Sequence, residues 1–160
     1  MKRLHRPANA QLGTGAADSA DPTPHEDPVA HHRVLIVDDY APFRSIARQV
    51  LTADEFLIVG EAADGAEAIR ACGELHPDVV LLDVQLPDID GFAVASVLTT
   101  GVDPPAVVLV SSRSRTDYGS RIADCRARGY ITKAELSGPA VRLLLPLPRV
   151  PPRAPQRRPA

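Results

Sequence analysis

The stretch VVLLDVQLPDIDG, residues 79–91, places a carboxylate directly after four aliphatic residues and before a turn rich in proline, aspartate and glycine. Aspartate is disfavoured inside a strand, and a buried carboxylate without a partner is costly or shifts its pKa until it is neutral. The position of Asp83 at the end of an apolar run therefore indicates that its carboxylate has a partner or a function. The aliphatic run that precedes it has no polar face, which is typical of a buried strand in a parallel sheet.

Four further runs also have the length of a strand. Three of them are rich in valine, isoleucine and leucine, and the last one along the chain is shorter. The five predicted strands are RVLIV (33–37), FLIVG (56–60), DVVLL (78–82), AVVLV (106–110) and GYIT (129–132). The segments between and after them carry apolar residues at intervals of three and four, which predicts helices over 41–53, 65–75, 91–100, 115–128 and 134–145. Five βα units with short connections predict a doubly wound α/β fold with a parallel sheet and helices on both faces.

Composition divides the chain of 160 residues into a head, a core and a tail. Residues 1–32 lack apolar periodicity, and residues 146–160 combine six prolines with four arginines, so both ends are predicted to be disordered and only 33–145 to fold. The net charge of -2 favours neither nucleic acid nor an anionic membrane as a partner. The two cysteines match no metal or disulfide pattern, and no apolar stretch could span a bilayer, so we expect a cytoplasmic protein.

Ligands of doubly wound folds bind at the carboxyl ends of the strands, and polar residues stand at these ends here. They are Asp38 and Asp39 after the first strand, Asp83 at the third, Ser111 after the fourth and Lys133 after the fifth. Clustered carboxylates repel one another unless a hard cation such as Mg²⁺ neutralises them. An ammonium and a hydroxyl beside that cation suit a phosphoryl group, for which Asp83 would be the nucleophile.

The segments VLIVDDYAPFR, DVVLLDVQLPDIDGF, VVLVSS and GYITKAEL, in this order, resemble the receiver domain of bacterial two-component response regulators. The resemblance covers about residues 33–145 and implies a flavodoxin-like sheet of order 2-1-3-4-5. It implies that Asp83 is an exposed phosphoacceptor. It also implies that Asp38, Asp39, Asp83 and the backbone carbonyl of Gln85 bind Mg²⁺, that Lys133 binds the phosphoryl group, and that Ser111 and Tyr130 form a conformational switch.

The implied partners are a histidine kinase or phosphotransfer protein and a downstream protein that the sequence does not identify. In this family, phosphorylation draws the serine toward the phosphoryl group, turns the aromatic residue inward and changes the partner preference of the face formed by the fourth helix, fifth strand and fifth helix. The sequence leaves homodimerisation through this face open. GYITKAELSG (129–138) resembles the branch with a helix-turn-helix output domain, but residues 146–160 have the wrong composition for one. We therefore expect a receiver that stands alone and does not bind DNA directly.

Several alternatives stay open at this point. Asp38 and Asp39 could simply cap the following helix, Ser111 and Lys133 could be ordinary surface residues, and Tyr130 could be packing at a strand end. A Mg²⁺-dependent phosphohydrolase would also use an aspartyl nucleophile, but such enzymes usually carry a second aspartate where this chain has Gln85. The arginines of the tail could bind nucleic acid or a protein partner, and the chain could be a decayed regulator. Alanine after Lys133 also puts in doubt the cis peptide bond that the family often has there.

Overall fold

The computed structural model describes residues 31–147 of the chain. The predicted head and tail fall almost entirely outside these residues. The described part contains a sheet of five parallel strands in the order β2-β1-β3-β4-β5, which confirms the predicted fold class. The strands are β1 (Arg33–Val37), β2 (Leu57–Ala62), β3 (Val79–Asp83), β4 (Ala106–Ser111) and β5 (Gly129–Thr132).

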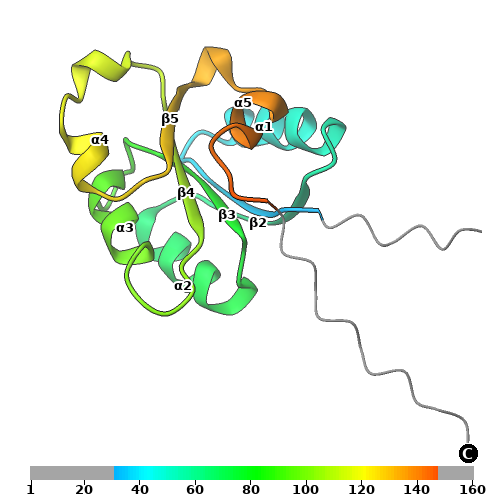
Figure 1. Cartoon of the computed structure of the whole chain (residues 1–160), viewed down its shortest axis with the longest axis horizontal. Coiled ribbons are helices and arrows are strands. Elements are labelled where there is room, and N and C mark those ends of the chain that lie inside the picture. Colours follow the sequence, from blue (N-terminus) through cyan, green and yellow to red (C-terminus); the bar gives the residue numbers. More distant parts are fainter. Residues whose placement is uncertain (1–30, 148–160) are drawn as a thin grey trace, which may run out of the picture.

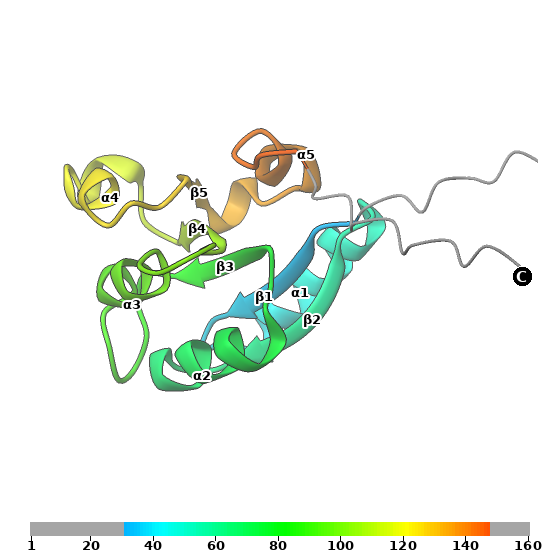
Figure 2. The same cartoon turned by 60° about the horizontal axis from the view of Figure 1, so that its bottom comes forward.

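Helices cover both faces of this sheet, as Figures 1 and 2 show. The helices are α1 (Ala41–Ala53), α2 (Gly65–Leu75), α3 (Gly91–Leu98), α4 (Arg121–Asp124) and α5 (Gly138–Arg142). Alternate residues of each strand point to opposite faces. Leu35, Leu82 and Leu109 pack in the core under α2, α3 and α4, whereas Ile36 and Leu81 pack in the core under α1 and α5.

Two predicted helices are much shorter in the structure. The segment predicted as one helix over 115–128 contains a 3₁₀ turn, Arg115–Asp117, and the single turn of α4. Gly119 and Arg126 both have positive φ, at 57° and 59°, and a helix cannot continue through either backbone conformation.

The helix predicted over 134–145 is likewise divided, into a 3₁₀ turn at Lys133–Glu135 and the short helix α5. Ser137 caps α5 by accepting a hydrogen bond from the backbone N–H of Ala140, and Pro139 stands in its first turn. Proline and an N-cap serine both favour a helix start at this place, so the pattern of apolar residues hides a helix boundary.

The loop after β3 lies tightly against the strand end. Gly91 donates its N–H to the carbonyl of Val84 at 2.9 Å, and a Cβ atom on Gly91 would lie only 2.8 Å from Val84 Cα and would also clash with the carbonyl oxygen of Asp83. Asp90 caps α3 by accepting from the N–H of Phe92. The absence of a side chain at Gly91 therefore lets α3 begin directly beside the predicted phosphoacceptor.

We expect Gly91→Ala to lower the free energy of unfolding by about 1–3 kcal/mol, because the new methyl group overpacks against backbone that cannot move aside. Gly73→Ala is the matched control. Gly73 lies in α2, and a methyl group added there would have no atom outside its own helix turn within 4 Å, so alanine should stabilise the chain by about 0.5–1 kcal/mol. Urea denaturation of both variants measures the difference. A Gly91→Ala protein as stable as the parent would contradict the close approach.

Candidate functional site

The register of the strands brings the predicted site residues to one edge of the sheet. Val37 is opposite Leu82, so Asp38 follows at the level of Asp83. Asp83 is opposite Val110, and Ser111 is opposite Thr132, which directly precedes Lys133. Each polar residue therefore appears at the carboxyl end of its strand because the preceding apolar residues hold that strand in the core.

Lys133 joins the two buried carboxylates of this edge. Its Nζ atom lies 2.6 Å from Asp38 Oδ2 and 3.1 Å from Asp83 Oδ2, and it also lies 4.6 Å from the centre of the Phe43 ring. Asp38 is 0% exposed and Asp83 is 4% exposed. The prediction of an exposed Asp83 is therefore wrong: its carboxylate is tolerated because an ammonium faces it, and because the N–H of Gln85 donates to Asp83 Oδ1 at 3.3 Å.

Burial and the neighbouring charges have opposing effects on the pKa values of Asp83 and Lys133. Burial, and then the negative charge of Asp38, raises the pKa of Asp83 in spite of the nearby Lys133 ammonium. Burial acts to lower the pKa of Lys133, but attraction to the carboxylates of Asp38 and Asp83, 2.6 Å and 3.1 Å away, raises it overall. One ammonium between two carboxylates leaves a net negative charge, so the edge has capacity for a further cation.

The carboxylates fit a hard divalent cation. One oxygen atom each from Asp38, Asp39 and Asp83 lies within 4.8 Å of the others, and they form the one such group of acidic, histidine or cysteine side chains in residues 31–147. Asp38 Oδ2 is fully buried and has the ammonium of Lys133 beside it, yet receives no hydrogen bond of acceptable geometry from the described residues. Mg²⁺ prefers such carboxylate oxygens and keeps several of its bound waters. Because Asp39 is exposed to solvent, the site has room for these waters on that side.

Capping does not explain the two acids after β1. The residue that caps α1 is Tyr40, and no side-chain hydrogen bond caps this helix. Asp38 Oδ1 instead accepts from the N–H of Tyr40 at 2.9 Å, which fixes the carboxylate at the strand end. Asp39 remains exposed beside it.

The predicted switch residues lie together, but with a third residue between them that sequence reasoning missed. Ser111 Oγ lies 2.8 Å from the hydroxyl of Tyr118, a residue that the sequence pattern assigned to the first turn of the helix predicted over 115–128. Tyr130 is 9% exposed and thus faces inward, and its hydroxyl donates to the carbonyl of Arg113. Burial raises the pKa of Tyr130, an effect that the adjacent Ser111 hydroxyl opposes. The two tyrosine rings lie 5.8 Å apart.

Other sequence predictions about this edge have mixed outcomes. No peptide bond among residues 31–147 is cis, so the bond after Lys133 is trans. The role of the Gln85 carbonyl as a metal ligand stays a prediction. Asp88, interpreted from sequence as a turn residue, accepts hydrogen bonds from the N–H groups of Gly65 and Ala66 and thereby ties the loop after β3 to the start of α2.

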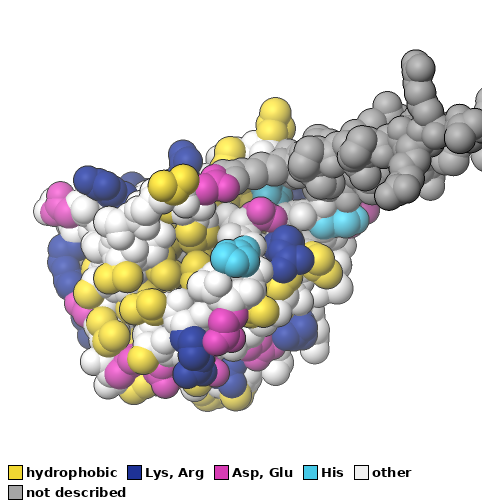
Figure 3. All heavy atoms as spheres, turned by 90° about the horizontal axis from the view of Figure 1, so that it is seen from below, with side chains coloured by type: hydrophobic (Ala, Val, Ile, Leu, Met, Phe, Trp, Pro, Cys, Tyr) yellow, Lys and Arg dark blue, Asp and Glu magenta, His cyan; other side chains and the backbone are white. Residues whose placement is uncertain are grey.

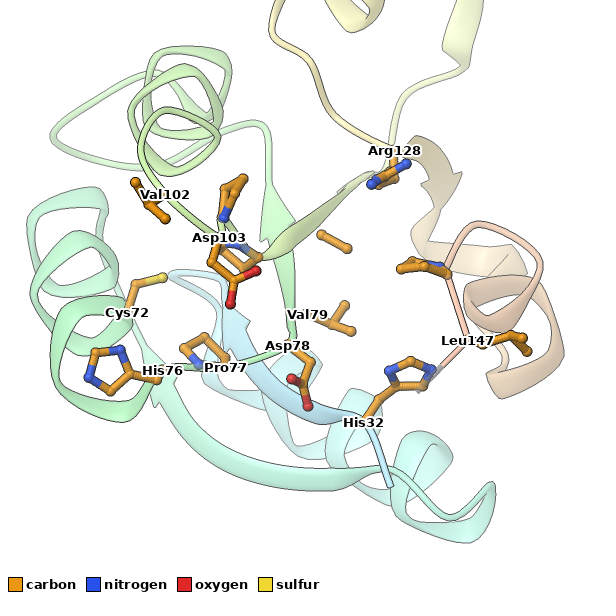
Figure 4. A pocket seen from close by; sticks show the side chains of 14 residues that line it. His32, Cys72, His76, Pro77, Asp78, Val79, Val102, Asp103, Arg128 and Leu147 are labelled. Carbon is orange, nitrogen blue, oxygen red and sulfur yellow. The ribbon is translucent and has the colours of Figure 1, made fainter. Parts of the chain in front are cut away.

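A cavity of about 370 Å³ lies at the opposite edge of the sheet (Figure 4). His32, Val79, Ala106 and Arg128 line it from the amino ends of four strands or the residues just before them. It contains none of the predicted site residues. On the face shown in Figure 3, acidic and basic side chains both occur, and neither kind forms a continuous patch. Within residues 31–147, no helix has the length and apolar character needed to cross a bilayer.

The raised pKa of Asp83 predicts how stability depends on pH. Folding disfavours its ionised form, so this cost is absent well below the ordinary pKa of 3.8 and appears as pH rises through the higher pKa of the folded chain. We expect Asp83→Asn to raise the melting temperature of Mg²⁺-free protein at pH 7, with a smaller gain at pH 4. Calorimetric melts at both pH values test this. A lower melting temperature at pH 7 would show that the contact with Lys133 outweighs burial.

Comparison with known proteins identifies the family. A family model described as the response regulator receiver domain matches residues 34–138. The transcriptional regulatory protein PdtaR of Mycobacterium tuberculosis is 39% identical over 113 residues, which are 70% of this chain and 54% of PdtaR. A protein-glutamate methylesterase/protein-glutamine glutaminase of Myxococcus xanthus is 47% identical over 81 residues, 50% of this chain and 23% of that protein. The chain thus spans about half or less of these relatives.

Solved structures give the same result. A two-component response regulator of the LuxR family from Aurantimonas sp. is 25% identical, with a TM-score of 0.63 over 71% of this chain and 85% of that chain. The chemotaxis response regulator CheY4 of Vibrio cholerae shares the fold at 20% identity, with a TM-score of 0.65 over 72% of this chain and 99% of that chain. Together with the family match over most of the folded core, these likenesses show that the chain belongs to the receiver-domain family of two-component response regulators.

Proposed function

We propose that this receiver domain accepts a phosphoryl group on Asp83 from a histidine kinase or phosphotransfer protein, with Mg²⁺ bound at the acidic edge. The observation that carries the proposal is the cluster of Asp38, Asp39 and Asp83 at the carboxyl ends of the strands, in which the ammonium of Lys133 pairs with the two buried members, Asp38 and Asp83. Membership of the family supports the partner class. A receiver has no need of the second aspartate that a phosphohydrolase uses, and Gln85 stands in its place.

Each residue has a task in the transfer. A carboxylate oxygen of Asp83 forms a bond to phosphorus while the bond from phosphorus to the donor imidazole nitrogen breaks, and that nitrogen keeps the electron pair. Lys133, which already contacts Asp83, pairs with an oxygen of the incoming group. Asp38 and Asp39 would hold Mg²⁺ together with Asp83 and the Gln85 carbonyl. The ion, when bound, neutralises charge on the phosphoryl oxygens and orients the group in line.

The switch would act through Ser111 and Tyr130. A phosphoryl group on Asp83 adds negative charge and hydrogen-bond acceptors next to β4. The conformation of the chain that makes the best hydrogen bonds to these acceptors then becomes more populated. Tyr130 is already buried, so the described conformation has the aromatic residue inward. The readout would be a protein partner, or a second copy of the chain, that distinguishes the two states. The free, buried thiols of Cys72 and Cys125 suit a reducing compartment, and we place this function in the cytoplasm.

Magnesium binding should depend on Asp39, the exposed member of the group. We expect Asp39→Asn to weaken Mg²⁺ binding by about tenfold or more, because the variant loses a charged oxygen ligand without disturbing the buried Asp38 and Lys133 pair. Isothermal titration calorimetry at pH 7 measures the affinity. Asp124→Asn, at an exposed carboxylate in α4, is the control and should bind Mg²⁺ as the parent does. Equal affinities of all three proteins would place the ion elsewhere.

Phosphorylation should require Asp83. With acetyl phosphate and Mg²⁺, we expect the parent chain and Asp124→Asn to give a slower band on a Phos-tag gel, and we expect Asp83→Asn to give none because an amide cannot form the acyl phosphate. Acid-stable label on Asp83→Asn, or label equal to that of the parent, would refute the proposal. Steady multiple turnover of small phosphoesters would instead favour the phosphohydrolase alternative.

A further inference from the structure

Tyr118 contacts the switch serine from the position directly after the 3₁₀ turn Arg115–Asp117. Its hydroxyl lies 2.8 Å from Ser111 Oγ, in a hydrogen bond that is buried from solvent. The side chains of Ser111 and Tyr118 are 1% and 8% exposed. A buried hydrogen bond between two hydroxyl groups is stronger than one exposed to water, and it restricts the direction in which each hydroxyl proton can point.

The protons of the two hydroxyl groups can be assigned from their partners. Arg113 donates its backbone N–H to Ser111 Oγ at 3.2 Å, which occupies one acceptor position of the serine. Among residues 31–147, the Tyr118 hydroxyl has no hydrogen-bond partner other than Ser111. A phenol is more acidic than an aliphatic alcohol and is the better donor, whereas the serine oxygen is the better acceptor. The distance alone allows either hydroxyl to donate, and the greater acidity of the phenol favours Tyr118 as the donor, which leaves the serine proton for another acceptor.

The neighbouring tyrosine does not take over this task. The hydroxyl of Tyr130 donates its proton to the carbonyl of Arg113, so this proton cannot also be given to Ser111. The rings lie 5.8 Å apart and the Ser111 hydroxyl is near both of them, but the Tyr130 hydroxyl gives its proton to the backbone and not to the serine. Tyr130 is bound to the backbone of the loop after β4, and Tyr118 is bound to the serine itself.

Packing holds the Tyr118 ring in the position that this hydrogen bond needs. The edge of the ring meets Phe92 of α3 at a centre distance of 5.3 Å. The guanidinium of Arg121 lies 4.3 Å from the centre of the Phe92 ring and forms an ion pair with Asp90. Because Asp90 and Phe92 belong to the start of α3, next to the loop of Asp83, the ring of Tyr118 is fixed relative to the predicted phosphorylation site.

We propose that Tyr118 is a positioning residue for phosphorylation: its hydroxyl donates to Ser111 and so leaves the serine proton free for an oxygen of the phosphoryl group on Asp83. The proposal rests on the function proposed above. Ser111 follows Val110, which is in register with Asp83, so the serine stands beside the acceptor. Without the Tyr118 hydroxyl, the Ser111 hydroxyl proton has no fixed orientation. It must then be oriented during phosphoryl transfer, and the entropy cost of this ordering slows the reaction.

The test compares the parent, Tyr118→Phe, Ser111→Ala and the double variant, each as the full chain. Phosphorylation by acetyl phosphate with Mg²⁺ is followed in time on Phos-tag gels. We expect Tyr118→Phe to lower the initial rate about fivefold, Ser111→Ala to lower it at least as much, and the double variant to be no slower than Ser111→Ala, because Tyr118 acts through the serine. Ser120→Ala removes an exposed hydroxyl that caps no helix from the same segment and serves as the control, with the parent rate expected.

A second measurement needs neither metal nor phosphodonor. In Mg²⁺-free protein, a hydroxyl proton that is buried and hydrogen-bonded exchanges slowly with water, so Tyr118 should give a proton NMR signal that Tyr118→Phe abolishes and Ser111→Ala shifts. Thermal melts verify that the ring, which phenylalanine retains, still packs. If Tyr118→Phe melts at a clearly lower temperature than the parent, Ser111→Ala is used instead. A shift of the Tyr118 hydroxyl signal in Ser111→Ala then tests the contact between the two residues.

The outcomes separate this inference from the proposed function. If the parent is labelled on Asp83 while Tyr118→Phe is labelled at the parent rate, Tyr118 only packs and the inference fails, but the phosphoacceptor function stands. A faster rate in Tyr118→Phe would also overturn the inference, because the tyrosine would then restrain the serine. If the parent is not labelled, or if Asp83→Asn is, the proposed function itself is wrong.

Discussion

The burial of two carboxylates at the end of a parallel sheet is the constraint on which this site depends. Asp38 follows the buried apolar residues 34–37 of β1, Asp83 follows the buried apolar residues 79–82 of β3, and the register of the two strands brings both carboxylates side by side. Two like charges in such a place would either destabilise the fold or take up protons. Lys133 compensates part of the charge from β5, the far edge strand. The part left uncompensated makes the edge suitable for a cation, and the charge of that cation would in turn offset the negative charge of a phosphoryl group.

The fold could be predicted from the sequence because each strand and helix is indicated by an apolar pattern within its own segment, and because the alternation of strand and helix repeats five times. The helices over 41–53 and 65–75 and the strands over 33–37 and 129–132 have the predicted bounds. Each has an apolar pattern that is continuous, and α2 also has a capping aspartate, Asp64, directly before it. The edge of the sheet with its acids and lysine followed from the same pattern, since parallel strands bring their carboxyl ends together.

The predictions failed where backbone conformation interrupts an apolar pattern. Tyr118, Ile122 and Cys125 are spaced as in a helix and are all buried, yet positive φ at Gly119 and Arg126 limits α4 to one turn. The same error concealed Tyr118: a tyrosine on the apolar face of a helix needs no explanation beyond packing. Its bond to Ser111 depends on the loop between β4 and α4, whose path periodicity does not determine. The burial of Asp83 was missed for a related reason, since exposure at a strand end depends on what covers it.

The short α4 gives the hydrogen bond between Ser111 and Tyr118 a consequence for signalling. In a long helix, many backbone hydrogen bonds would hold the segment after β4 in place whatever the serine did. Here that segment contains a 3₁₀ turn and one helical turn, so its backbone hydrogen bonds are local. Side chains connect it to the rest of the domain: Tyr118 contacts Ser111 and Phe92, and Arg121 pairs with Asp90. If Asp83 is phosphorylated as proposed, a change in the hydrogen bonding of Ser111 would act on this short segment first, and would thereby alter the surface that a partner meets.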